Sequence, residues 1–131
     1  MMEVKLINLT PHILRIFNIE DVEYNSKSKS FYLKRKDSYT IPLVLQPGNN
    51  IPRVNVTRDV VNTLNGIPVI ESNYGEIKNN PESRDGVYYI VSAITANAFR
   101  KNNRKDILVP NQIVRDEHGN IIGCASFSSF V

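Results

Sequence analysis

Short apolar runs separated by turn residues dominate the hydrophobic pattern of the chain, which is typical of β-strands. The clearest run is residues 87–91, an unbroken Val-Tyr-Tyr-Ile-Val segment that predicts a strand buried on both faces. A polar–apolar alternation over residues 53–56 predicts a half-buried strand. Further strands are predicted over residues 4–9, 13–17, 39–46, 67–70, 74–77, 107–109, 113–116 and 121–125.

Turn residues mark the boundaries between these predicted strands. Thr10-Pro11-His12 separates the first two runs, so residues 4–17 are expected to form a hairpin or a bulged strand. Residues 117–120 are expected to form a hairpin turn between the last two strands. Pro110 is expected to end the strand over residues 107–109.

Helical signals are few. Ser92 stands where an N-cap belongs, and Ala93, Ala96 and Ala98 favour a helix that ends before Asn102-Asn103. A second short helical segment is predicted over residues 58–64, ended by Asn65-Gly66. The expected fold is therefore α/β (α+β), a sheet-dominated single domain over residues 1–131 with antiparallel hairpins and one or two helices.

Length and composition restrict the class of protein. At 131 residues the chain is expected to be one domain. Its single cysteine, Cys124, excludes an internal disulfide and fits a reducing compartment. The chain shows neither an apolar run of membrane-spanning length nor a signal-peptide pattern at its start, so a cytoplasmic protein is expected.

The net charge of +3 is modest, but five basic residues crowd one segment: Lys27, Lys29, Lys34, Arg35 and Lys36. We interpret this segment first as a solvated hairpin or loop, and an anion-binding surface is the alternative. A module for polymeric DNA or RNA would carry a stronger basic excess with interleaved aromatic residues, so no such partner is predicted.

Catalytic signatures are lacking. The sequence contains no phosphate-binding loop, dinucleotide fingerprint, nucleophile elbow or Cys/His metal pattern, and we expect no metal or cofactor. His118 is interpreted as an exposed turn residue, and His12 as a residue that fixes the break between the first two strands. Acidic residues occur in the turns, but their spacing does not suggest convergence on one metal ion.

Nucleotide binding needs an aromatic face for the base, arginines for phosphates and donors for ribose. Tyr74 lies beside Gly75, which would permit close approach of a flat ring, and ordinary core packing is the alternative for this tyrosine. The arginines are ambiguous, because Arg104 and Arg115 could instead form surface salt bridges with Asp106 and Asp116.

Five sequence segments, here called the ordered phrases, follow one another along the chain: LINLTPH (6–12), NGIPVIESNYGEI (65–77), RDGVYYIVSAITANAF (85–99), DILVP (106–110) and IVRDEHGNIIGC (113–124). Together they resemble a family of small phage and prophage proteins, part of which is known as the Thoeris anti-defence proteins of the first type. These proteins are sponges that bind an immune signal, a cyclic ADP-ribose isomer, without degrading it. The resemblance leaves out roughly residues 18–50, and the Asn-rich loop 79–83 departs from the known members.

The resemblance implies a non-enzymatic protein of the host cytoplasm that sequesters glycocyclic ADP-ribose. It implies homo-oligomers, dimers that can assemble into hexamers, with ligand pockets made by two subunits. Tyr74 would stack on adenine, and the phosphate contacts would come from four arginines: Arg53, Arg84, Arg104 and Arg115. Several known sponges also bind cyclic oligonucleotides at a separate place. Two alternatives stay open, namely a metal-dependent nucleotide-processing enzyme and a phage protein with only protein partners.

Overall fold

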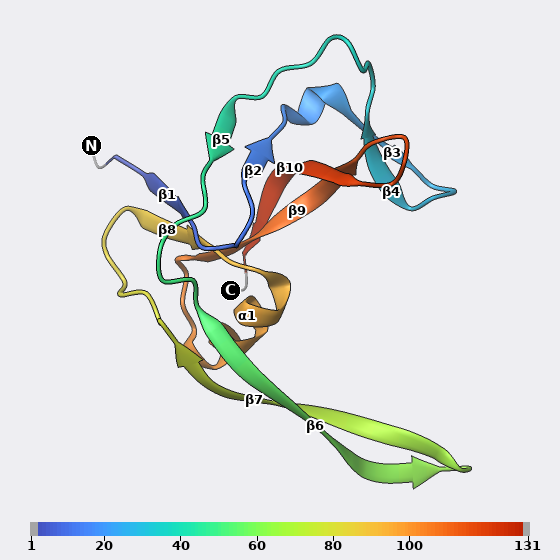
Figure 1. The fold of residues 1–131 in the computed structure, drawn as a ribbon, viewed down its shortest axis with the longest axis vertical. Helices are drawn as coiled ribbons and strands as arrows, with labels where there is room; N and C mark the ends of the chain where they lie inside the picture. The colour runs from blue at the N-terminus through green and yellow to red at the C-terminus, as the bar shows by residue number, and fades with distance from the viewer. Residues whose placement is uncertain (1–2, 130–131) are drawn as a thin grey trace.

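The computed structural model describes residues 3–129. This part of the chain is sheet-dominated, with one α-helix, as the sequence predicted (Figure 1). In chain order the elements are β1 (Lys5–Asn8), β2 (Leu14–Ile16), η1 (Ile19–Asp21), β3 (Val22–Asn25), β4 (Ser30–Leu33), β5 (Leu43–Leu45), β6 (Arg53–Leu64), β7 (Ile67–Lys78), β8 (Val87–Ile90), α1 (Ala93–Phe99), η2 (Arg100–Asn102), β9 (Ile107–Arg115) and β10 (Ile121–Ser129).

The body of the molecule is an eight-stranded mixed sheet. Its main path runs β1-β8-β9-β10-β2-β5, and the β3–β4 hairpin joins β9 through the pair Phe31 and Val114. Strand β8 lies between two parallel partners, β1 and β9, and its residues Tyr89 and Ile90 are buried. The prediction of a strand covered on both sides is thus confirmed.

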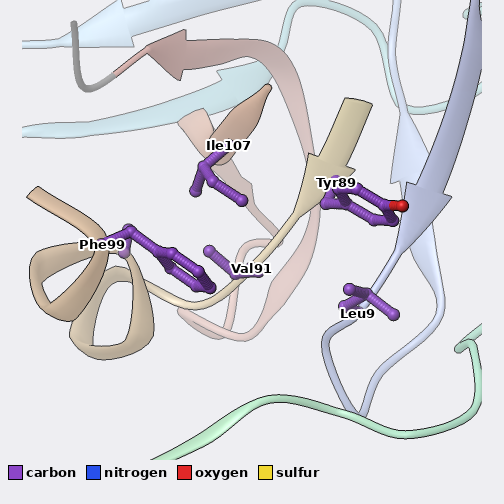
Figure 2. Packing of buried hydrophobic residues seen from close by; sticks show 6 residues of the cluster. Leu9, Tyr89, Val91, Phe99 and Ile107 are labelled. Atoms are coloured by element: carbon purple, nitrogen blue, oxygen red, sulfur yellow. The ribbon is translucent and has the colours of Figure 1, made fainter. Parts of the chain in front are cut away.

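Helix α1 packs its buried residues on this central region. The Ser92 side chain accepts a hydrogen bond from the backbone N–H of Thr95 (3.4 Å), which confirms the predicted N-cap. Figure 2 shows Phe99 of α1 beside Val91 and Ile107 in the larger buried cluster. This packing fixes the helix relative to β8 and β9.

The break between β1 and β2 is organised by Asn8, which is almost fully buried. Its amide nitrogen donates to the carbonyls of His12 (2.7 Å) and Leu45 (3.1 Å), and its oxygen accepts from Thr10. The predicted pairing of these two segments with each other is wrong, because β1 pairs with β8 whereas β2 pairs with β10 and β5. His12 contributes its backbone carbonyl to this break.

Strands β6 and β7 form a separate two-stranded sheet, here called the arm, which projects from the body (Figure 1). The predicted helix over residues 58–64 is wrong, because this segment belongs to β6. The β-branched Val60, Val61 and Thr63 favour a strand. Asn65 and Gly66 both have positive φ (51° and 80°), as the two-residue turn of a β-hairpin requires.

Two other strands differ from prediction in length. Strand β9 continues through Pro110, which pairs with Phe127 of β10. On the other side of β9, pairing with β8 reaches only Leu108 and pairing with β4 occurs at Val114, so a residue without an N–H is tolerated between them. Residues 39–46 form a strand only over Leu43–Leu45, and β7 is one continuous strand where two strands, over residues 67–70 and 74–77, were predicted.

Gly123 lies where the sheet leaves no room for a side chain. A Cβ at this position would overlap the carbonyl oxygen of Arg15 and would lie 2.6 Å from the ring of Phe17. We expect Gly123→Ala to lower the free energy of unfolding by roughly 1–3 kcal/mol, the usual cost of overpacking. In Gly75→Ala the nearest atom, the carbonyl oxygen of Asn55, lies 3.4 Å away, so this control should cost little. Urea unfolding of both variants checks the difference, and equal midpoints would contradict it.

Candidate ligand site

A groove of about 360 Å³ lies where the arm meets the body, and we call it the arm-root groove. Its lining combines an aromatic ring, a carboxylate and two side-chain amides with small and apolar residues. The lining residues come from β7, the following loop and the α1–η2 segment: Tyr74, Gly75, Glu76, Ile77, Asn80, Ala98 and Asn102.

A β-bulge in β7 shapes this groove. Val54 pairs with Ile77 and Val56 pairs with Tyr74, so Gly75 and Glu76 together stand opposite one residue of β6. The extra residue interrupts the strand's alternation, which leaves Tyr74 and Ile77 on the same face. Both side chains are half-buried, and the groove therefore has an aromatic–aliphatic wall.

Arg104 holds Asn80, another residue of the groove lining, in place. Its Nε and Nη2 atoms donate to the two carboxylate oxygens of Asp106, at 2.9 and 2.6 Å. Its Nη1 atom donates to Oδ1 of Asn80 and to the carbonyl of Pro81, both at 2.7 Å. The guanidinium also lies 5.3 Å from the ring centroid of Phe99. We call this arrangement the Arg104 clamp, and it ties the loop after β7 to α1 and β9.

The Arg104 clamp favours a structural role for this arginine. Four of its five N–H groups already donate within the protein, and its side chain is only 13% exposed. The salt bridge with Asp106 that the sequence suggested is confirmed. Arg104 thus contributes to the arm-root groove by orienting Asn80, which lines it.

Arg115 lies at the other end of β9 from Arg104 and lines a second groove of about 230 Å³, here called the Arg115 groove. Its Nη1 atom donates to the carbonyl of Gly119 (2.8 Å). The other lining residues include an ion pair, Lys36 with Glu117, and two aromatic rings: Tyr32, Leu33, Lys36, Tyr39, Asp116, Glu117 and Ile122. This groove also joins aromatic and basic groups, but it contains no residue of the arm.

The remaining predicted arginines lie apart from Tyr74. Arg53 pairs in register with Lys78 at the base of the arm, and β-sheet alternation places these two cations on the face opposite Tyr74. Arg84 is exposed in the loop before β8. The structure therefore places Tyr74 on the groove wall and Arg104 next to the groove through Asn80, and it leaves Arg53, Arg84 and Arg115 away from the groove.

Sequence reasoning missed Asn80 and Asn102 as lining residues. The available signal was the polar, Asn-rich character of residues 79–80 and 102–103. Neither segment could be assigned to a site without knowing that the loop after β7 and the end of α1 face each other.

Other candidate chemistry is sparse in the described residues. No group of three or more His, Cys, Asp or Glu side chains there could hold a metal ion. Burial raises the pKa of the Cys124 thiol, which disfavours the reactive thiolate. Between residues 3 and 129, no helix has the length and apolar character needed to cross a membrane.

Comparisons with known protein families, curated proteins and solved structures gave no match. The resemblance to the anti-defence sponges therefore rests on the ordered sequence phrases alone.

Removal of Arg104 should destabilise the protein. Arg104→Ala would leave the Asp106 carboxylate, only 12% exposed, without its cation, which we expect to cost about 3–5 kcal/mol of unfolding free energy. Arg104→Lys should restore only part of this, because lysine cannot form the two-pronged contact. Arg84→Ala, an exposed control, should change stability by no more than about 0.5 kcal/mol. Equal denaturant midpoints for Arg104→Ala and Arg84→Ala would contradict the clamp.

The turn at residues 116–120 should contribute a pH-dependent stability. The pKa of Asp116 is lowered from 3.8, mainly because the backbone N–H of Asn120 donates to its carboxylate, with His118 assisting. Since the folded pKa is the lower one, the stabilisation is complete above the unfolded pKa and is lost as pH falls through the folded value. Asp116→Asn should thus be less stable than the parent at pH 7, with the gap closing below about pH 4. A gap that persists unchanged at pH 2 would rule this out.

Proposed function

We propose that this protein captures a cyclic ADP-ribose-type signal in the arm-root groove and holds it without chemical change. The observation that carries the proposal is the half-buried ring of Tyr74 on the groove wall, next to the bulge at Gly75. A groove of about 360 Å³ falls within the size range of small-molecule sites. The ordered sponge-like phrases in the sequence supply the class of ligand.

The lining suits the base and ribose of such a ligand. An adenine ring can stack on Tyr74, since every base presents a π-face to an aromatic side chain. The amides of Asn80 and Asn102 offer both donors and acceptors for the base edge, and the Glu76 carboxylate can accept from ribose hydroxyls. The Arg104 clamp orients Asn80 before any ligand arrives, which lowers the entropic cost of binding.

The phosphates of such a ligand would need a cation from outside the described lining of the arm-root groove. Among the described residues that line the arm-root groove there is no lysine or arginine, and Glu76 adds a negative charge. A second copy of the chain can supply arginine to this groove, with Arg53, Arg84 and Arg115 as the candidates outside it. This need supports a homo-oligomeric sponge, as a dimer or as dimers assembled into a hexamer. Its setting would be the cytoplasm of an infected host.

Titration of the protein with cyclic ADP-ribose isomers tests the proposal. Tyr74→Ala should weaken binding by roughly one to two decades, because base stacking on an aromatic is worth about 1–3 kcal/mol. Tyr74→Phe should retain most of the affinity. The matched control is Tyr24→Ala, which removes an exposed aromatic of β3 outside both the arm-root groove and the Arg115 groove and should leave binding unchanged.

Unchanged binding in a folded Tyr74→Ala variant would rule out the arm-root groove as the site. A parent protein that binds no cyclic ADP-ribose isomer, but does bind a cyclic trinucleotide in the same titration panel, would overturn the proposed signal.

A further inference from the structure

The outer part of the arm carries many exposed apolar side chains. From residue 57 to residue 73 every position of β6, the turn and β7 is exposed. Six large apolar residues in this stretch are between 37% and 66% exposed: Val60, Val61, Leu64, Ile67, Val69 and Ile70. An isolated two-stranded ribbon is marginally stable in water. We therefore expect another surface to cover it.

The register shows which of these side chains share a face. Asp59 stands opposite Glu71, and Val61 is an extra residue that bulges out of β6. Beyond the bulge, Asn62 pairs with Val69 and Leu64 pairs with Ile67. Because alternate residues of β7 point to the same side, Glu71, Val69 and Ile67 lie on one face. We call this side, an acidic pair followed by Val69, Leu64 and Ile67, the acid–apolar face.

The acidic pair indicates the charge of the covering surface. Asp59 and Glu71 are directly opposite each other, an arrangement that is unfavourable for like charges in a β-ribbon. Their nearby polar contact is neutral, since Asn73 donates its side-chain amide to Asp59 at 3.3 Å. A basic side chain from a partner would relieve this repulsion.

The body of the chain carries an exposed segment in which basic residues are followed by apolar residues, as acidic residues are followed by apolar residues on the arm. Residues 34–44 are exposed throughout. They begin with Lys34 and Arg35 and continue with Tyr39, Ile41 and Leu43, which are 36–43% exposed. The segment ends in β5, the last strand on its side of the sheet, and among the described residues Leu43 and Val44 have no strand partner on their outer side, whereas Leu45 and Pro47 contact Asn8 of β1. Open apolar edges are prone to pair with another chain.

A chain cannot cover its own arm in this way. Figure 1 shows β5 and the tip of the arm at opposite ends of the molecule. A second copy removes this restriction, and two copies that exchange arms form a closed pair in which each contact occurs twice.

We propose that the acid–apolar face of one copy packs against residues 34–44 of a second copy, with Asp59 and Glu71 facing Lys34 and Arg35. The inference deepens the proposed function and rests on it in one respect, namely that the arm-root groove requires a second copy. The contact itself needs no ligand, so assembly and ligand capture fail separately.

The mass of the purified protein in solution, measured by sedimentation without ligand, tests the contact. The parent should sediment as a dimer or a multiple of it. The double variant Leu64→Asp, Ile67→Asp should sediment as a single chain with an unchanged circular dichroism spectrum. Val4→Asp is the matched control, since Val4 is 62% exposed, between Leu64 (57%) and Ile67 (66%), but lies outside both surfaces. This variant should have the mass of the parent.

Charge exchange then identifies the partner surface. One variant carries Asp59→Lys and Glu71→Lys, and the other carries Lys34→Glu and Arg35→Glu. Each variant alone should sediment as a single chain, because the arm of one copy and the body of the next now carry charges of the same sign. An equimolar mixture of the two variants should regain the parent mass, because both contacts between unlike variants join opposite charges.

Three results would overturn the inference: a monomeric parent, an arm variant with the parent mass, or a mixture that stays monomeric. The last result would mean that the arm is covered by a protein of different sequence or by another face of this one. A parent that assembles as expected but binds no cyclic ADP-ribose isomer would contradict the proposed function and leave this contact standing.

Discussion

The arrangement around the arm depends on one ionic contact, the bidentate pair of Arg104 with Asp106. The same guanidinium holds the loop at Asn80 and Pro81 and lies against Phe99. The loop at Asn80 and Pro81, the end of α1 and the residue before β9 therefore meet at one side chain. Because the pair is largely withdrawn from water, either charge without the other would carry a large desolvation cost. This contact therefore helps to position Asn80, which lines the groove.

The arm-root groove also depends on one of the two β-bulges in the ribbon of β6 and β7. The bulge at Gly75 and Glu76 leaves Tyr74 and Ile77 on the wall of the groove, and the second bulge, at Val61, lies further out along the arm. Beyond this point the arm is exposed on both faces and cannot complete its own hydrophobic cover. Among the described residues, the groove of one copy has an aromatic wall but no lysine or arginine, and the outer arm has exposed apolar side chains on both faces. In the proposed assembly, a second copy supplies the cation and covers the acid–apolar face.

Local signals in the sequence predicted the body well. The unbroken apolar run of β8, the Ser92 cap and the turn at residues 117–120 each follow from short-range physics, and all three are present. The arm was mispredicted because Asn65-Gly66 was interpreted as the end of a helix, whereas it is the hairpin turn that pairs residues 58–64 with β7. Long-range strand pairing also determined where the predicted arginines lie. The strand predicted over residues 107–109 already separated Arg104 from Arg115, but spacing along the chain gave no sign that Arg53 would face away from Tyr74.

Stoichiometric capture without turnover is the central claim. The most direct measurement incubates a cyclic ADP-ribose isomer with excess protein, removes unbound ligand by filtration, and then denatures the retained protein by heat. The account predicts that the filtrate before heating contains almost no ligand and that heating releases the same compound, chromatographically unchanged and in full. A converted product after heating, or ligand that passes freely into the first filtrate, would contradict it.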